Sequence, residues 1–218
     1  MSTPYSLTIA NTGSSPAQVA MYSTLPSEGG SAHSIIMFSQ QIDASDSHTY
    51  TWNLNWELGW GTSIVPLTNG VSFTSQGNPI NVSPHKGDQN GISITYDGDF
   101  SSAGTTSSKL EDTHLKITTD DSFTKTDSAK MSVCAYLSDK PIFAMQGEPN
   151  GVYDLTTHPT YYLAVTDQKE GIAVSGTFIS NAQKIEFDGV FDLSCSLNDR
   201  NEFACPPAGS VNHDAFDL

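Results

Sequence analysis

The chain has 218 residues and a formal net charge of −15, with 24 acidic residues against 9 lysines and arginines. So acidic a surface repels phosphate backbones, which excludes nucleic acid as a main partner and disfavours unaided binding to anionic lipid. Aromatic residues make up 10% of the chain, which excludes an intrinsically disordered protein. The length suits one large domain with its own core. The charge itself favours solubility, with cation binding by clustered carboxylates as the alternative.

The first residues lack the basic region and apolar run of a secretory signal. This predicts a cytoplasmic start, while a mature fragment behind an added methionine and an extracellular location after non-classical release both stay open. No apolar run approaches the length of a transmembrane helix, so we expect no transmembrane segment. We predict a single β-sandwich domain over residues 1–207, followed by a polar C-terminal tail over residues 208–218.

The strongest structural pattern lies between residues 48 and 60, where large side chains, mostly apolar, occupy every second position. These positions hold His48, Tyr50, Trp52, Leu54, Trp56, Leu58 and Trp60. Period-two alternation is typical of a half-buried β-strand, whereas a helix would scatter the aromatic rings around its circumference. We therefore predict one long strand with all three tryptophans on its buried face and a solvent-exposed opposite face.

Shorter apolar or alternating runs between turn residues predict the other strands. They cover residues 5–9, 19–22, 71–73, 92–96, 115–117, 131–137, 142–145, 161–165, 172–174, 185–187 and 190–197, and residues 34–38 fit a strand or a short helix. Residues 76–79 predict a turn, and the Ser/Thr/Gly-rich residues 98–112 predict a surface loop or an inter-strand excursion. The chain is therefore predicted to be all-β: an antiparallel β-sandwich of two sheets with about 10–13 short strands and little or no helix.

Three cysteines, Cys134, Cys195 and Cys205, leave at least one thiol unpaired. Cys195 and Cys205 lie in a predicted hairpin, and they are directly opposite each other if Leu197 pairs with Phe203. A cross-strand disulfide is then geometrically conceivable. An odd number of cysteines fits buried, reduced thiols better, so reduced thiols are the preferred interpretation.

Segments along nearly the whole chain follow the order found in one protein family. They are Tyr5 to Asn11, Tyr22-Ser-Thr-Leu-Pro26, Tyr50-Thr-Trp-Asn-Leu-Asn-Trp56, Trp60-Gly61, Gly70-Val-Ser-Phe73, His158-Pro-Thr-Tyr-Tyr162, Ile185-Glu-Phe187 and Leu193 to Phe203. Through them the chain resembles the RhiA-type proteins, named after a bacterial protein expressed in the rhizosphere. The resemblance implies a small bacterial or fungal all-β protein without a signal peptide. It implies no active site or cofactor, and the acidic excess and the paired cysteines are departures from it.

The tryptophan face has two interpretations. Rings two residues apart on one strand face can form a stacking platform for a sugar or another ligand, but burial in the core is their usual fate. If the rings do reach solvent, Trp56 and Trp60 are the candidate ligand-binding residues. Trp60 lies between two glycines and is the one most expected to be exposed.

Asp97 and Asp99 flank Gly98 on a predicted turn and are the candidate metal ligands. Calcium binds about six to eight oxygens, often from such loops. The same residue types form turns for backbone reasons alone, and the segment matches no known calcium loop, so a turn is the preferred interpretation and Ca²⁺ binding the alternative. The sequence contains neither a zinc-ligand spacing nor a nucleophile elbow nor a phosphate-binding loop.

Three functions are compatible with these features. The first is a non-catalytic binding or interaction module that recognises a carbohydrate or another surface ligand, including a protein. The second is a membrane-active or self-assembling β protein, comparable in architecture to the small acidic cytolysins of the aegerolysin type. The third is a hydrolase. We expect the first, without enzymatic activity, and leave homo-oligomerisation open.

Overall fold

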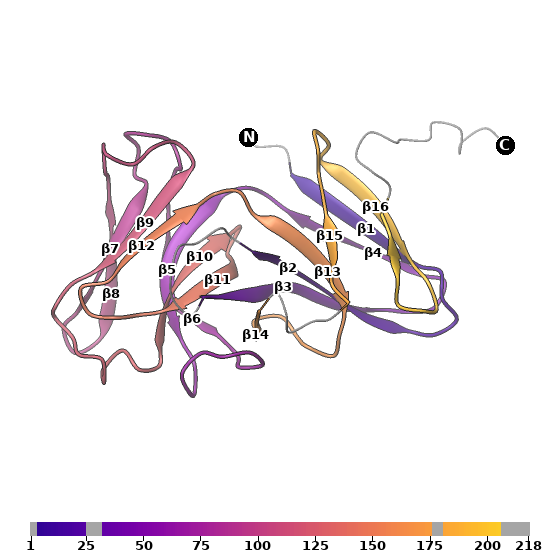
Figure 1. Ribbon diagram of the computed structural model, residues 1–218, viewed down its shortest axis with the longest axis horizontal. Helices are drawn as coiled ribbons and strands as arrows, with labels where there is room; N and C mark the ends of the chain where they lie inside the picture. The colour runs from indigo at the N-terminus through magenta and orange to yellow at the C-terminus, as the bar shows by residue number, and fades with distance from the viewer. Residues whose placement is uncertain (1–3, 25–31, 176–180, 206–218) are drawn as a thin grey trace.

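The computed structural model describes residues 4–24, 32–175 and 181–205 (Figure 1). This part of the chain forms 17 strands and no helix, which confirms the all-β sandwich prediction. The details differ from the expectation in two respects: the strands are more numerous than about 10–13, and they form three sheets instead of two. The predicted tail over residues 208–218 lies outside the described residues.

A nine-stranded sheet forms the centre of the molecule, in the order β15-β13-β2-β3-β11-β10-β5-β6, with β14 paired to β3. Its strands are β2 (Ala17–Thr24), β3 (Ala32–Ile42), β5 (Trp56–Thr62), β6 (Thr74–Asn81), β10 (Met131–Leu137), β11 (Lys140–Gln146), β13 (Thr160–Val165), β14 (Ala173–Val174) and β15 (Gln183–Ile185). Strand β10 is buried along its whole length, as expected for a central strand covered on both faces. Residues 34–38, predicted as strand or short helix, are part of β3.

Two four-stranded sheets accompany this large sheet. The terminal sheet has the order β17-β16-β1-β4 and contains β1 (Tyr5–Asn11), β4 (Ser47–Trp52), β16 (Asp192–Leu197) and β17 (Phe203–Ala204). The internal sheet has the order β12-β9-β7-β8 and contains β7 (Gly91–Tyr96), β8 (Phe100–Thr105), β9 (His114–Thr119) and β12 (Val152–Thr156). Strands β1 and β16 are parallel, as are β7 and β9. The expectation of purely antiparallel sheets was therefore wrong for these two pairs.

Both small sheets cover the same face of the large sheet. Alternate residues of β10 show this, because Val133 and Ala135 belong to a core cluster that also contains Leu7 of the terminal sheet and Ile117 of the internal sheet. Cys134, between them, faces a separate cluster on the opposite side. In Figure 1 the two small sheets lie at opposite ends of the molecule, with the large sheet between them. The protein is thus a sandwich in which one layer is divided into two sheets.

The predicted long strand at residues 48–60 is two strands, β4 and β5, in two different sheets. The chain leaves the terminal sheet after Trp52 and enters the large sheet at Trp56, and Leu54 between them is 38% exposed. The prediction of one strand was wrong because period-two alternation does not reveal a crossing between layers. The prediction of burial was right, since Trp52, Trp56 and Trp60 all belong to the same core cluster.

The face of β5 opposite the tryptophans is also buried, contrary to the prediction of a solvent-exposed face. Its residues face the second cluster, where Phe73 packs against the strand. A Cβ atom at Gly61 would lie 2.3 Å from the Phe73 ring. Gly61, on the face predicted to be exposed, instead makes room for the Phe73 ring.

Three segments that form strands were not predicted as strands. Residues 76–79, expected to form a turn, are part of β6, where the register with β5 shifts. Residues 98–112, expected to form a loop, include β8, and β12 was not predicted at all. Strands β6 and β8 are polar and show little apolar alternation, which is why side-chain periodicity missed them. Residues 71–73, predicted as a strand, contribute only an isolated bridge between Ser72 and Ile172.

Cys195 and Cys205 form a disulfide across the β16–β17 hairpin. Leu197 pairs with Phe203 in this hairpin, as the sequence suggested, and this register places the two cysteines opposite each other. The preference for reduced thiols was therefore wrong for this pair. The strand register brings these two sulfur atoms together, and an odd number of cysteines requires only that one thiol stays unpaired. Cys134 is free and buried, and desolvation by burial raises the pKa of its thiol above the ordinary range.

Candidate functional site

A pocket of about 350 Å³ lies where the terminal sheet meets the edge of the large sheet. Its lining comes from the start of β1, the crossing segment between β4 and β5, the start of β13, and β15 with the residues after it. The lining residues are Tyr5, Leu54, Thr157, His158, Pro159, Thr160, Tyr161, Lys184, Ile185, Glu186 and Phe187. Pockets of this size accommodate small ligands and occur typically at such junctions between layers.

One wall of the pocket is aromatic. The Tyr5 ring stacks on Trp52, with ring centroids 5.8 Å apart, and meets the Phe187 ring edge-on at 5.1 Å. Phe187 also packs edge-on against Trp52 at 5.5 Å. Tyr5 and Phe187 are half-buried, so their rings are supported from below and still border the open space.

Trp52 supports this wall from beneath. Its indole is 2% exposed, and its Nε1–H donates a hydrogen bond of 3.1 Å to the Tyr161 hydroxyl. Burial is the main cause that raises the pKa of Tyr161, so this hydroxyl stays protonated at neutral pH. The bond links the terminal sheet to β13 of the large sheet, and it therefore fixes the floor of the pocket across the junction.

Three polar residues also contribute to the lining, and the β13–β15 register puts the Lys184 side chain on the Tyr162 face of the sheet, away from the aromatic wall. The Lys184 ammonium and the Glu186 carboxylate form an ion pair with Nζ and Oε1 2.6 Å apart. The hydrogen bond within this pair lowers the pKa of Glu186 and raises that of Lys184, so both groups are charged at neutral pH. The exposed His158 adds a third polar side chain. The pocket thus has an aromatic wall, and its lining also includes polar residues.

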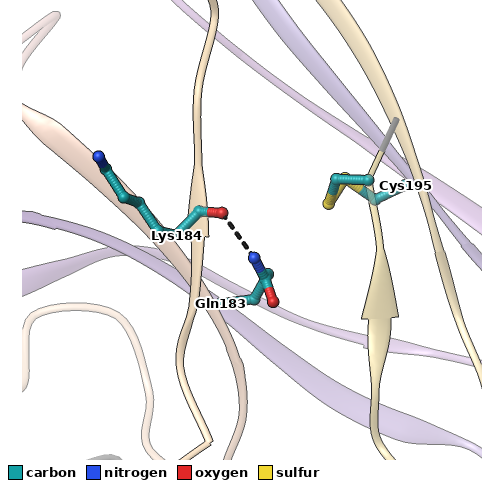
Figure 2. The surroundings of a disulfide bond; sticks show 4 residues. Gln183, Lys184 and Cys195 are labelled. Carbon is teal, nitrogen blue, oxygen red and sulfur yellow. Dashed lines mark hydrogen bonds between the residues drawn. A yellow bond between two sulfur atoms is a disulfide. The ribbon is translucent and has the colours of Figure 1, made fainter. Parts of the chain in front are cut away.

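The backbone of Lys184 is held on both sides. Lys184 pairs with Tyr162 in the β13–β15 ladder. The Gln183 side chain donates a hydrogen bond of 2.9 Å from Nε2 to the Lys184 carbonyl oxygen. Figure 2 shows this bond, and it shows the Lys184 side chain directed away from the nearby Cys195 disulfide. The position of the ammonium therefore depends on β15 and not on the disulfide.

The tryptophans chosen from the sequence lie outside this pocket. Trp56 is 5% exposed and Trp60 is 7% exposed. The Trp60 ring packs against Phe100 of the internal sheet at 5.4 Å. In this structure neither ring offers a face to solvent, so the packing interpretation of the alternation is the one that the geometry supports.

Asp97 and Asp99 are exposed at the turn between β7 and β8. The Asp97 amide donates to the Asp99 carbonyl oxygen, and the Asp99 carboxylate accepts a hydrogen bond from the Phe100 amide. These bonds account for the two residues as turn formers. Within the described ranges no group of three or more histidines, cysteines or carboxylates lies close enough to hold a metal ion, and calcium binding stays a prediction.

The pocket residues were quoted from the sequence only as strand ends or turns. Tyr5 begins the first predicted strand, His158 precedes the predicted strand at residues 161–165, and Phe187 ends a short run. A usable signal did exist, since these three residues lie in three of the segments that carry the family resemblance. Sheet order brings Tyr5 and Phe187 together from the two ends of the sequence, and side-chain periodicity does not reveal sheet order.

Pairing, layers and the pocket together define an all-β sandwich with a pocket at the junction of two sheets. In the described residues there is no helix that is long and apolar enough to cross a membrane. Comparison with protein families matches the RhiA family over residues 2–207, nearly the whole chain. The chain belongs to the RhiA family. Comparisons with curated proteins and with solved structures gave no match.

Proposed function

We propose that this protein is a non-catalytic carbohydrate-binding module and that the pocket between the terminal sheet and β15 holds the sugar. The observation that supports it is the pair of half-buried rings, Tyr5 and Phe187, at the edge of a pocket that polar residues such as Thr157 and His158 also line. A sugar ring has an apolar face and an edge of hydroxyls. An aromatic platform binds the first, and hydrogen-bonding groups bind the second.

The aromatic wall is pre-arranged for this role. Tyr5 rests on the buried Trp52, and Phe187 contacts Trp52, Tyr5 and Tyr161 edge-on. Rings fixed by such contacts lose little conformational entropy when a ligand binds, so more of the contact energy appears as affinity. A pocket of this kind suits one or two sugar rings better than a long polymer groove.

The chemistry of the pocket supports binding without catalysis. Glycoside hydrolysis normally uses two carboxyl groups, one of which is kept protonated by a raised pKa. Among the residues that line the pocket, Glu186 is the one carboxylate, and Lys184 lowers its pKa. A carboxylate held ionised at neutral pH accepts hydrogen bonds from hydroxyls and is unsuited to act as a general acid.

The proposal is tested by applying the purified protein to a glycan array and measuring the affinity for the best ligand by calorimetry. Phe187→Ala should weaken binding about twofold to tenfold, because aromatic contacts of this kind contribute roughly 0.5–1.5 kcal/mol. Phe191→Ala is the matched control, since Phe191 also touches Tyr5, at 5.2 Å, but does not line the pocket. Absence of glycan binding, or an equal loss in both variants, would contradict the proposal.

A further inference from the structure

A buried carboxylate lies in the large sheet, away from the residues that line the pocket. Glu57 is on β5, between Tyr136 of β10 and Asn81 of β6, and it is 7% exposed. Glu57 Oε2 accepts a hydrogen bond of 3.0 Å from the Asp139 amide, in the turn between β10 and β11. A buried carboxylate is normally compensated by a cation or by several hydrogen bonds. The groups around Glu57 therefore decide whether its charge is tolerated.

No positive charge compensates Glu57 within the described ranges. Its neighbours on the adjacent strands are a tyrosine and an asparagine, and none of the ion pairs includes it. The lysine at the turn, Lys140, pairs with Leu137, and Leu137 faces the core on the other side of the sheet. Lys140 also forms an ion pair with Glu170. The Glu57 carboxylate thus depends on the Asp139 amide and on a proton of its own.

The turn places a second carboxyl group beside the first. Ser138 and Asp139 have φ values of 50° and 64°, and they connect Leu137 to Lys140, which pair with each other. Two central residues with positive φ are typical of a type I′ turn. Burial is the main cause that raises the pKa of Glu57; the Asp139 amide lowers this pKa, and the Asp139 carboxyl group raises it again. Glu57 therefore holds a proton more readily than a glutamate in water.

We propose that Glu57 and Asp139 form a proton-dependent clamp that joins the β10–β11 turn to β5. In the closed state the protonated Glu57 carboxyl donates a hydrogen bond to the Asp139 carboxylate, and its other oxygen keeps the bond from the Asp139 amide. Loss of the proton replaces the hydrogen bond between the carboxyl groups by repulsion between two negative charges. The clamp acts on the stability of the large sheet and is independent of the proposed sugar binding.

The clamp should tighten as the pH falls. A carboxyl group whose pKa is higher in the folded than in the unfolded state gives the folded protein the greater number of bound protons. Glu57 therefore destabilises the folded protein above its folded-state pKa, and this loss is relieved as the pH falls toward the ordinary glutamate pKa of about 4.3. A carboxylate in an ion pair has the opposite effect, because acid breaks its bond.

Glu57→Gln tests the clamp, because a glutamine imitates the protonated glutamate. Its amide oxygen can accept from the Asp139 amide, and its NH₂ group can donate to the Asp139 carboxylate at any pH. The variant should melt about 2–4 °C above wild type at about pH 8. The difference should shrink as the pH is lowered to about 4, where wild type carries the proton as well. Glu111→Gln is the matched control, since Glu111 pairs with Lys86 at an exposed site and should show no such rise.

Asp139→Asn and the double variant Glu57→Gln/Asp139→Asn separate the carboxyl pair from simple burial. If the two groups interact, Glu57→Gln should raise the melting temperature at about pH 8 by less in the Asp139→Asn background. An equal rise in both backgrounds would overturn the clamp, as would a Glu57→Gln variant that melts at or below wild type. If Glu57→Gln does not fold, Asp139→Asn decides: its melting temperature should vary less with pH than that of wild type, and an unchanged pH dependence would refute the clamp.

Discussion

The terminal sheet and the internal sheet cover the same face of the large sheet, but the pocket lies beside the terminal sheet, where Tyr5 lines it. The internal sheet contributes aliphatic residues, Ile92, Ile94, Leu115, Ile117 and Leu155, all at 0–1% exposure, and the rings of Tyr96 and Phe100, which pack together beside Trp60. The terminal sheet contributes aliphatic residues in its middle and, at one end, the stacked rings of Tyr5 and Trp52. The pocket lies at this aromatic end.

The difference shows how one architecture provides both a closed contact between sheets and a pocket. Branched aliphatic side chains interdigitate closely between sheets and leave few voids. Flat rings packed edge-on, such as Tyr5 against Phe187, meet their neighbours along fewer directions and leave space at the edge of the contact. Removing a large side chain from either small sheet should lower the free energy of unfolding by a similar amount. Only a change at the aromatic end of the terminal sheet should also affect ligand binding.

The largest expected effect comes from removing the floor of the pocket. Trp52→Ala should lower the free energy of unfolding by about 3–5 kcal/mol, the range for a large aromatic side chain in a core. It should also abolish ligand binding, because Tyr5 and Phe187 both rest on this ring. Denaturant unfolding and calorimetry measure the two effects.

Ile117→Ala provides the comparison in the internal sheet. It should cost about 2–5 kcal/mol and leave the affinity of the folded protein unchanged. If this variant weakened binding as much as the tryptophan variant, the proposed division between a closed contact and a binding contact would be wrong.

The disulfide is a second difference between the two small sheets, since it lies in the terminal sheet and not in the internal sheet. Replacing Cys195 and Cys205 together by serine should cost about 2–4 kcal/mol, mainly because the unfolded chain regains freedom. A thiol-free reductant should lower the melting temperature of the wild type and leave that of the double variant unchanged. Equal melting curves for wild type with and without reductant would show that the bond does not form.

The smallest effect concerns the outer faces of the two sheets, where they are alike. Thr8 and Thr49 share a hydroxyl hydrogen bond of 2.8 Å in the terminal sheet, and Thr95 and Ser101 share one of 3.1 Å in the internal sheet. Thr49→Val and Thr95→Val should each cost no more than about 1 kcal/mol, the usual range for a cross-strand pair. A much larger loss in one sheet, measured by denaturant unfolding, would show that the outer faces differ as well.

The elements predicted correctly from the sequence are those with strong side-chain patterns. Residues 131–137 form an apolar run and become the central strand β10, and the hairpin with Leu197 opposite Phe203 has the expected register. The misses have a common physical cause. Strands such as β8 are specified by backbone pairing with a neighbour, and their polar side chains look the same in a loop. The crossing at Leu54 was missed because alternation continues through it.

The site was less predictable than the fold. The tryptophans attracted attention because they are large, yet Trp56 and Trp60 are buried by the internal and large sheets. The residues that do border the pocket, such as Tyr5 and Phe187, come from opposite ends of the sequence and from strand ends, where no periodicity applies. Only the sheet order brings them together.

The parallel pairing of β1 with β16 has a consequence for folding during synthesis. Ser6 and Asp192, which are hydrogen-bonded side by side, are 186 positions apart. During synthesis, the first strand must therefore wait for these 186 further positions before its second neighbour arrives. Contacts between such distant segments also slow folding. The terminal sheet should accordingly be among the last parts to become ordered, and a nascent chain that stops short of β15 should lack the pocket.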